Sequence, residues 1–576
     1  LSTANANYLS NIILYSQRLY GADPPRVEAL YRAVLARQEA DPASSDKRNW
    51  MTLWNLAKST SLERGWKNNG FRSDLSEAIA YQRRVIAAMG PGQGNSFELE
   101  LASLLQQRRD TAAEAETIYR RALAGDPDNP ALIENLGNTL QILDRFDDAL
   151  PIRRHAVEIA KARFGPSHRE TLRLAQNLGV ALWIQRRPSE ARPYYEDVLA
   201  GYRAELSAIP EGANADYRRS LSDFISLKAS DLLKLYWTDR ANPAQGGDAA
   251  SRAAGFAVAQ LAHPSVSSAA ISETAARTLA ERARKGDLFG AWVAARDRVV
   301  SLDAAIGGAA QRGAGGDADR GRLLEERAAA GKMLAETTIR LQDQMPDIFA
   351  TLRPEPVALA EVTGSGAKPA LLREDEALIL LYPGMPDARG EMSRGIAFAV
   401  TRAASAWTEI PIDGADLAQI VVDLHGQLSD RQNSGATERV PGEDLFDYLH
   451  YDRGAAYRVH QALFGDPAVA ALLKDKGRWI IVPEGPLLAL NFAALVSRPP
   501  AGGAAGDIDP AMLRATAWLG LERAIVVLPS VDALRTARRG RAMAWGPGKF
   551  YGVGDPAFRG VAGPAPKASP DRIAVD

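Results

Sequence analysis

The chain has 576 residues, more than one hydrophobic core organises, so its length predicts about two to four domains of roughly 100 to 200 residues each. Its formal net charge of -1 supplies no long-range field for nucleic acid or an anionic membrane, and its lack of cysteine excludes disulfides, thiolate zinc sites and a cysteine nucleophile from this sequence. No run approaches the roughly 18 uninterrupted apolar residues of a bilayer span and no signal peptide is visible after Leu1, so the cytoplasm is the expected location.

Residues 1–240 alternate short amphipathic helices with polar turns, and the pattern repeats. The pair Leu136-Gly137 recurs 42 residues later as Leu178-Gly179, and an alanine follows each pair at the same distance, Ala149 and then Ala191. Small residues at these positions let two helices approach closely, and each helix pair leaves an apolar face that only the next pair can cover. The sequence therefore predicts a curved stack of helix pairs with a concave surface.

These residues resemble the tetratricopeptide repeat (TPR). The segment LIENLGNTLQILDRFDDALPIRRHAVEIA carries the Leu-Gly pair and the spaced alanines, and GPSHRETLRLAQNLGVAL resembles the longer, kinesin-light-chain type of the repeat. The resemblance covers roughly residues 50–205, although other helical solenoids share some of its features. It implies an array that binds a protein or peptide partner.

Five polar side chains are expected on the concave surface in this register: Glu134, Asn138, Gln141, Arg173 and Gln176. Amides and charges of this kind could hold a partner peptide. An ordinary wetted helix surface remains the alternative for each of them.

Residues 241–350 are rich in alanine and arginine and predict a long antiparallel helical hairpin that serves as a spacer. Its first helix has an apolar side made of Phe289, Trp292, Val293, Val299 and Val300. After a glycine-rich break, four residues follow at the four-three-four spacing typical of coiled-coil packing, namely Leu334, Thr338, Leu341 and Met345. The Trp and Met residues are interpreted as core rather than as a cofactor site.

The periodicity changes in residues 351–576. Short apolar runs bounded by turn residues predict buried strands at 377–382, 396–400, 479–482 and 525–528, and helical stretches lie between them at 417–428 and 457–473. This alternation favours an α/β sheet with helices on both faces. A basic run near the end, made of Arg535, Arg538, Arg539 and Arg541, is interpreted as a solvated helix face.

The stretch RWIIVPEGPLLALNFAALV breaks a strand at a proline-bounded turn and resumes at helical spacing from Leu487 to Val496. In an open α/β sheet the loop after a strand lies where ligands usually bind. The turn holds only one ionisable side chain, Glu484, and no base or nucleophile stands beside it. We therefore expect Glu484 to be a surface carboxylate that caps the following helix.

This stretch also resembles the VPDGPL...PFAAL signature of CHAT domains, caspase-like domains commonly found behind TPR arrays. Four further pieces agree with the family in order: EDEALILLYPG, AFAVTRAASAWTEIPIDGADLAQIV, WLGLERAIVVLPSVDALR and FYGVGDPAF. The chain departs from the family at Glu484, where Asp is usual, at Leu488, where an aromatic residue or His is usual, and at Asn491, where Pro is usual. The resemblance spans roughly residues 250–560 and implies a caspase-like fold.

The resemblance implies a catalytic His and Cys downstream of FYGVGDPAF. This chain has no cysteine, so no catalytic residue is carried over, and whether the protein is an enzyme stays open.

The sequence also lacks the residues that other common catalytic and binding motifs require. The stretch GPGKF places Phe550 where a phosphate loop needs Ser or Thr, and Gly364-Ser365-Gly366 lacks the flanks of a nucleophile elbow. Among the six histidines only His450 and His460, ten residues apart with Asp447 and Asp452 beside them, approach a metal-ligand pattern. That pattern is weak, so no metal or other cofactor is expected.

The sequence therefore predicts an α plus α/β protein. It comprises a TPR-like α-solenoid at 1–240, a helical hairpin spacer at 241–350 and the N-terminal part of a caspase-like CHAT domain at 351–576. Two functions remain open. One is a fragment of a TPR-CHAT protein whose repeats bind a protein partner and whose complete CHAT domain is a cysteine peptidase. The other is a non-enzymatic protein-binding adaptor with a degenerate caspase-like module.

Overall fold

The fold is described from a computed structural model. It describes residues 24–41, 45–67, 75–89, 95–209, 215–262, 273–274, 276–277, 279–311, 317–346, 348, 355–364, 369–384, 393–433, 451–500 and 510–542. Three motifs considered from the sequence, His450, GPGKF (546–550) and FYGVGDPAF (550–558), lie outside these residues.

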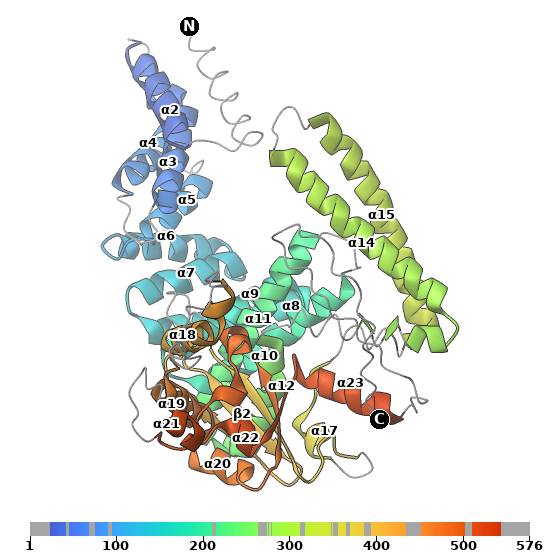
Figure 1. The fold of residues 1–576 in the computed structure, drawn as a ribbon. Coiled ribbons are helices and arrows are strands. Elements are labelled where there is room, and N and C mark those ends of the chain that lie inside the picture. Colours follow the sequence, from blue (N-terminus) through green and yellow to red (C-terminus); the bar gives the residue numbers. More distant parts are fainter. Residues whose placement is uncertain are drawn as a thin grey trace, which may run out of the picture.

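A stack of antiparallel helix pairs forms the N-terminal part of the protein (Figure 1). Its helices are α2 (Pro24–Glu39), α3 (Asp46–Lys67), α4 (Ser76–Met89), α5 (Asn95–Leu105), α6 (Ala112–Gly125), α7 (Pro130–Ile142), α8 (Phe146–Phe164), α9 (Arg169–Ile184), α10 (Pro188–Ala208), α11 (Ala215–Thr238) and α12 (Gly247–Ala262). Local signals start these helices, since Asn129 caps α7 by accepting from the amides of Ala131 and Leu132, and Pro130 occupies its first position. The repeats predicted from the sequence are therefore present as helix pairs.

The Leu-Gly pairs lie where the two helices of a pair touch. A Cβ atom added to Gly137 would stand 3.0 Å from the Cγ atom of Arg153 on the next helix, and one added to Gly179 would stand 3.0 Å from the ring of Tyr195. That separation is tighter than ordinary van der Waals contact. The glycines are thus the small residues that the predicted helix contacts require.

Two long helices, α14 (Gly286–Gln311) and α15 (Asp317–Gln344), pack side by side. They run antiparallel, because Trp292 Nε1 donates to Thr338 Oγ1 (3.1 Å) near one end and Arg327 Nε donates to Asp303 Oδ1 (2.9 Å) near the other. Their apolar core contains most of the residues predicted for it: Phe289, Trp292, Val299, Leu334, Leu341 and Met345. Val300 is an exception, since its side chain is 63% exposed.

The C-terminal part contains a mixed five-stranded sheet in the order β3-β2-β1-β4-β5. Its strands are β1 (Glu376–Tyr382), β2 (Ile396–Thr401), β3 (Ser405–Glu409), β4 (Arg478–Pro483) and β5 (Ala524–Val527). Strands β1, β4 and β5 are parallel neighbours, whereas β2 pairs antiparallel with both β1 and β3. The sequence predicted four of these strands and missed β3, a five-residue hairpin partner of β2.

Helices cover both faces of this sheet. Along β1, Ala377, Ile379 and Leu381 face α18 (Gly414–Asn433), α19 (Arg453–Phe464) and α20 (Pro467–Leu473). The alternate residues Leu378 and Leu380 face the other way, as the two-residue period of a strand requires. That second face is covered by α11 and α12 together with α17 (Leu359–Thr363) and α23 (Val531–Ala542).

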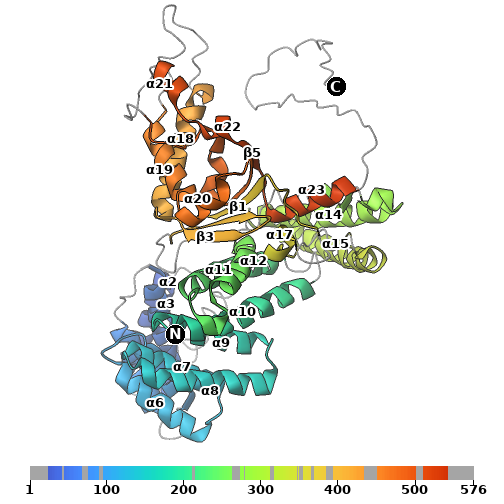
Figure 2. The same ribbon diagram turned by 90° about the horizontal axis from the view of Figure 1, so that it is seen from below.

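The repeat array and the sheet consequently share one hydrophobic core, and Figure 2 shows the sheet lying across α11 and α12. Trp407 of β3 packs edge-on against Trp237 of α11, with ring centroids 5.1 Å apart, and its Nε1 donates to Asp248 Oδ1 at the start of α12 (2.8 Å). Tyr382 at the end of β1 donates its hydroxyl to Ser230 Oγ of α11 (2.5 Å). The sheet closes the end of the array, where a further repeat would otherwise be needed to bury α11 and α12.

Two predicted helices are divided in the structure. The stretch 457–473 is split into α19 and α20, because Asp466 caps α20 and Pro467 occupies its first turn. The stretch 487–496, which has helical spacing, forms two short 3₁₀ helices, η4 (Gly485–Ala489) and η5 (Phe492–Ala494), the second capped by Asn491. Capping side chains and prolines, rather than apolar spacing, set these boundaries.

The prediction that Glu484 is a surface cap is wrong. Its side chain is only 8% exposed and makes no capping hydrogen bond to η4. One carboxyl oxygen, Oε2, has no hydrogen-bond partner among the described residues. Burial raises the pKa of Glu484 well above its usual value, which favours the protonated form of this carboxyl.

The prediction that the basic run is a solvated face is also wrong for its described side chains. Arg538 on α23 pairs with Glu376 Oε2 (2.6 Å) and donates to the carbonyl of Leu371 (3.0 Å). Arg535 pairs with Asp532 and donates to the carbonyl of Glu355 (3.0 Å). The side chains of Arg539 and Arg541 lie outside the described part. The basic residues thus fasten α23 to the start of the sheet.

Candidate partner-binding surface

The first helices of adjacent repeats, α7 and α9, carry the polar residues predicted to hold a partner. We call the group formed by Glu134, Asn138, Gln141, Arg173, Gln176 and Asn177 the first-helix surface. Glu134 of α7 pairs with Arg173 and Asn177 of α9, and Asn138 and Gln141 of α7 both bond to Arg153 of α8. The structure thus joins most of the predicted residues into two groups.

Glu134 is the centre of one half of this surface. Its side chain is buried, with 5% of the residue exposed, and its carboxylate pairs with Arg173 and accepts a hydrogen bond from Asn177 Nδ2, both on α9. Arg173 also pairs with Glu170 (2.5 Å), and this pairing lowers the pKa of Glu170 and raises that of Arg173. A buried carboxylate needs such partners, so Glu134 connects the two repeats.

Arg153 holds the other half of this surface together through hydrogen bonds to Asn138 and Gln141. It extends from α8, is 4% exposed, and its Nη2 donates to Asn138 Oδ1 (2.6 Å) and Gln141 Oε1 (3.1 Å). Burial lowers the pKa of Arg153, and the charge of Glu134 opposes that shift. The side-chain oxygens of Asn138 and Gln141 are therefore used within the protein, while their amide N–H groups have no hydrogen-bond partner among the described residues.

Gln176 lies half-buried on α9 and makes no hydrogen bond to a described residue. The exposed polar groups of this surface are thus the amides of Asn138, Gln141 and Gln176 and the guanidinium of Arg173, whose side chain is 40% exposed. Sequence reasoning missed Arg153 and Asn177. The signal for Arg153 was present, because Gly137 leaves the space through which its side chain passes.

A similar arrangement occurs two repeats earlier. Glu100 on α5 accepts from Trp54 Nε1 on α3 (2.5 Å) and from Gln82 Nε2 on α4 (3.2 Å). Lys58 stands over the ring of Trp54, 3.8 Å from its centroid, and pairs with Glu100 (3.6 Å). In both places a carboxylate on one first helix binds side chains of the neighbouring one.

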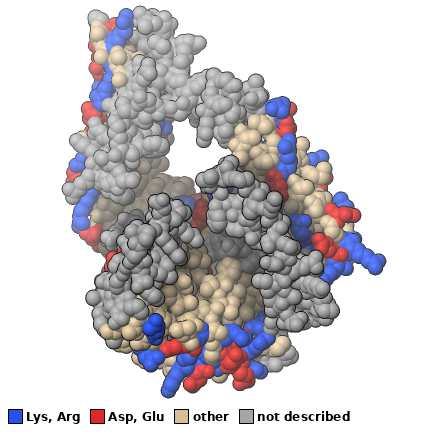
Figure 3. Space-filling model, viewed as in Figure 1, with Lys and Arg blue, Asp and Glu red and all other residues tan. Residues whose placement is uncertain are grey.

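Charge over the described part of the protein is mixed. Figure 3 shows basic and acidic side chains side by side along the α14–α15 hairpin and at the bottom of the view, where the sheet region lies. Among the described residues no group of three or more His, Asp or Glu side chains is placed to hold a metal ion. None of the described helices is long and apolar enough to cross a membrane.

Comparison with known families identifies the repeats. Residues 128–204 match the tetratricopeptide repeat family, which places α7, α8, α9 and most of α10 within it. The chain therefore contains a helical region of TPR repeats, an architecture that presents extended surfaces for binding other proteins. No curated protein matches the chain.

Several solved structures are similar to parts of the chain. TPR-like repeats of a putative kinesin light chain from Podosopora anserina are 17% identical, with 36% of this chain and 99% of that chain covered and a TM-score of 0.30. BtubC (BKLC) from P. vanneervenii is 18% identical over 44% of this chain and 90% of that one, with a TM-score of 0.27. A Rap protein complexed with competence and sporulation factor is 11% identical over 61% and 95%, with a TM-score of 0.24.

Proposed function

We propose that this chain is a protein-binding scaffold whose TPR array holds a protein or peptide partner on its first-helix surface, the predicted concave side. The observation that carries the proposal is the network across α7 and α9, in which Glu134 pairs with Arg173 while Arg153 accommodates Asn138 and Gln141. A binding surface gains affinity when its polar groups are already held in place, because fewer rotamers are lost on association. Here Arg173 and two amides are held in place before a partner arrives.

The groups left for a partner are mainly hydrogen-bond donors. The amide nitrogens of Asn138 and Gln141 suit the carbonyl oxygens of an extended peptide, whereas the guanidinium of Arg173 is already paired with Glu134 and Glu170. The paired oxygens of Glu134 are turned inward and do not repel such a partner. Recognition of a peptide backbone is therefore the expected mode.

Selection of peptides from a random library on the full chain, followed by fluorescence anisotropy, tests this proposal. Asn138→Ala and Gln176→Ala are expected to weaken a selected peptide by about 5-fold each, the value of one hydrogen bond. Gln419→Ala removes an exposed amide on α18 and serves as the matched control. Equal affinity for all three variants, or a peptide crosslinked outside α7 and α9, would overturn the proposal.

A second candidate function rests on the sheet region. We propose that residues 351–576 correspond to the front part of a caspase-like CHAT module. In this proposal residues 1–240 form the repeat array and residues 241–350 form the spacer. The proposed location of the protein is the cytoplasm. The parallel strands β1, β4 and β5 with helices on both faces support this proposal, together with the VPEGPL turn after β4. The complete module would be a cysteine peptidase, and the alternative is a non-enzymatic adaptor.

The intact mass of the native gene product, compared with 62.0 kDa for this sequence, separates these two possibilities. A larger product that brings a His and a Cys on strand ends would favour the peptidase. A product of the same mass would favour the non-enzymatic adaptor. Because this sequence has no cysteine, the chain itself is expected to cleave no peptide, and measurable peptidase activity of the purified chain would contradict the assignment.

A further inference from the structure

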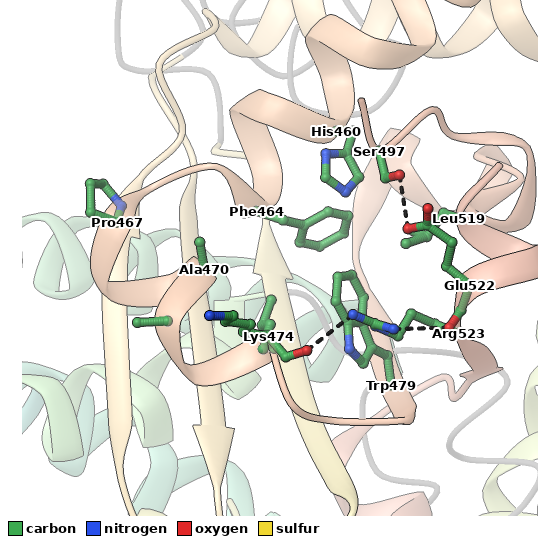
Figure 4. Close-up of a pocket in the computed structure, with 12 residues that line it drawn as sticks. His460, Phe464, Pro467, Ala470, Lys474, Trp479, Ser497, Leu519, Glu522 and Arg523 are labelled. Atoms are coloured by element: carbon green, nitrogen blue, oxygen red, sulfur yellow. Dashed lines mark hydrogen bonds between the residues drawn. The ribbon is translucent and has the colours of Figure 1, made fainter. Parts of the chain in front are cut away.

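A hollow of about 470 Å³ opens on the side of the sheet that faces away from the repeats. Its walls are α19, α20, the first residues of β4, and α22 (Leu519–Glu522), and Figure 4 shows the side chains that line it. Its volume lies within the range of small-molecule sites. Neither the TPR array nor the turn at Glu484 contributes to it, so the proposed functions do not account for it.

The floor of the hollow is aromatic. Phe464 lies between Trp479 and His460, with ring centroids 5.1 and 5.3 Å away, and both neighbouring rings meet it edge to face. Leu473 and Leu519 extend this apolar surface. A ligand that fits here needs a flat or compact apolar group, because aromatic walls bury such groups well.

The polar groups within the hollow carry little available negative charge. Burial lowers the pKa of His460 to about 4, so its imidazole is neutral near pH 7. Glu522 is the one carboxylate among the lining residues, and both of its oxygens are in use, one bound by Ser497 Oγ (2.9 Å) and the other by Arg498 (2.7 Å). The lining of the hollow thus contains a neutral imidazole and no unpaired carboxylate.

Two cations stand at the rim. Arg523 donates to two backbone carbonyls, those of Lys474 and Glu522, each at 3.0 Å, as Figure 4 shows. These backbone carbonyls hold the guanidinium in place, and the charge of Arg523 also acts on the nearby Glu522 carboxylate. Together with Lys474, the cations among the lining residues outnumber this one carboxylate. Lys474 is exposed, lines the hollow, and forms no ion pair with any described residue. The mouth of an aromatic hollow is therefore positively charged.

We propose that this hollow binds a small hydrophobic carboxylate, a phenyl-sized group with one carboxylate, which is either a free acid or the C-terminal residue of a peptide. The apolar part would lie against Phe464 and Trp479, and the carboxylate would meet Lys474 and Arg523 at the rim. A charged rim above an apolar floor selects a ligand with both properties, because a neutral apolar ligand leaves the cations unpaired and a small hydrophilic anion leaves the floor uncovered.

The first measurement titrates 3-phenylpropanoate and 3-phenylpropanamide into the full chain, with binding followed by isothermal calorimetry and by saturation-transfer NMR. The acid is expected to bind with a Kd of about 1 mM, the affinity that about ten heavy atoms supply, and the amide about 10-fold more weakly. Equal affinities, or no binding of the acid at 10 mM, would overturn the proposal.

Two pairs of variants localise the binding. Lys474→Glu reverses a rim charge and should weaken the acid about 10-fold while leaving the amide unchanged, and Lys332→Glu makes the same change at an exposed lysine on α15. Ala470→Met fills the hollow from α20 and should abolish binding of both compounds, whereas Ala468→Met adds the same group to that helix outside the lining residues. Unchanged binding in the Ala470 variant would place the ligand elsewhere and refute the assignment.

A third titration identifies the source of the carboxylate. A hexapeptide of five alanines ending in phenylalanine carries the same chemistry as 3-phenylpropanoate on a longer chain. Binding at least 10-fold tighter than that of the free acid would indicate a peptide C-terminus. Equal or weaker binding would indicate a free acid. Because none of the substituted residues belongs to the first-helix surface, these results are independent of peptide binding by the repeats.

Discussion

The repeat array and the sheet bury their carboxylates in different ways. In the array, Glu134 is buried between two repeats and binds both Arg173 and Asn177. In the sheet, Glu484 is buried to a similar extent at the end of β4, and its Oε2 has no hydrogen-bond partner among the described residues. The first carboxylate is stabilised by its neighbours, whereas burial raises the pKa of the second and so favours its protonated form.

The sheet also contains a paired counterpart. Glu376 at the start of β1 is almost fully buried and binds Arg538 of α23 (2.6 Å) and Arg478 of β4 (3.4 Å), and its pKa is lowered despite the burial. The comparison indicates that the hydrogen-bond and ion-pair partners close to a buried carboxyl group, rather than the class of fold, decide whether its charged form is favoured. Removing each acid should therefore have a different cost and a different dependence on pH.

The largest effect is expected for Glu376→Ala. It leaves Arg538 and Arg478 without their carboxylate and should destabilise the sheet region by about 3 kcal/mol, because breaking a buried ion pair strands its partner. Urea unfolding followed by circular dichroism measures this. Glu374→Ala removes a carboxylate that is 87% exposed and pairs with Arg402, so it should change stability by under about 0.5 kcal/mol. Similar losses in both variants would contradict the role of Glu376.

A smaller loss is expected for Glu134→Ala in the array. Arg173 keeps Glu170 as a partner, so the cost is about 2 kcal/mol, mostly from the unpaired Asn177 and the space left behind. Thermal unfolding of the wild-type chain and the variant measures it. The matched control is Glu158→Ala on α8, an exposed residue paired with Lys161, which should shift the unfolding temperature little.

For Glu484→Gln the expected change is in the pH dependence. The folded-state pKa of Glu484 is raised, so its contribution to stability is fully present below the usual value of 4.5 and is lost as the pH rises through the folded-state pKa. The loss is up to about 1.4 kcal/mol per pH unit. Urea midpoints at pH 5, 7 and 9 should fall in the wild-type chain and fall less in Glu484→Gln. Parallel profiles would show that Glu484 is ionised in the folded protein.

The smallest effect is expected for Gly137→Ala. The added Cβ gains about 1 kcal/mol of helix propensity but meets the side chain of Arg153, which its hydrogen bonds hold in place, so the net loss should be about 1 kcal/mol. Gly290→Ala on α14, where an added Cβ meets nothing within 4 Å, should instead stabilise its helix by a few tenths to about 1 kcal/mol. Thermal unfolding compares the two.

Much of the repeat region could be predicted from local sequence. Leu136-Gly137 and Leu178-Gly179 marked the helix contacts. Glu134, Asn138 and Arg173 were expected on the concave surface, and the structure pairs Glu134 with Arg173 and bonds Asn138 to Arg153. The hydrogen bond between Asn138 and Arg153 was not expected from the sequence. Arg153 belongs to the second helix of the repeat, and the pattern of that helix indicates an ordinary core-facing side. Whether these residues bind a partner stays a prediction.

The sequence by itself determined the elements that depend on neighbours along the chain: the helix pairs with their caps, the α14–α15 hairpin and four of the five strands. Only the tertiary structure decided which of these elements meet. It placed α11 and α12 on the sheet, buried Glu484, paired Arg538 with Glu376, and brought Phe464, Trp479 and Lys474 around one hollow. The physical reason is that periodicity reports which face of an element is apolar, whereas burial of a single charged side chain depends on residues that are distant in sequence.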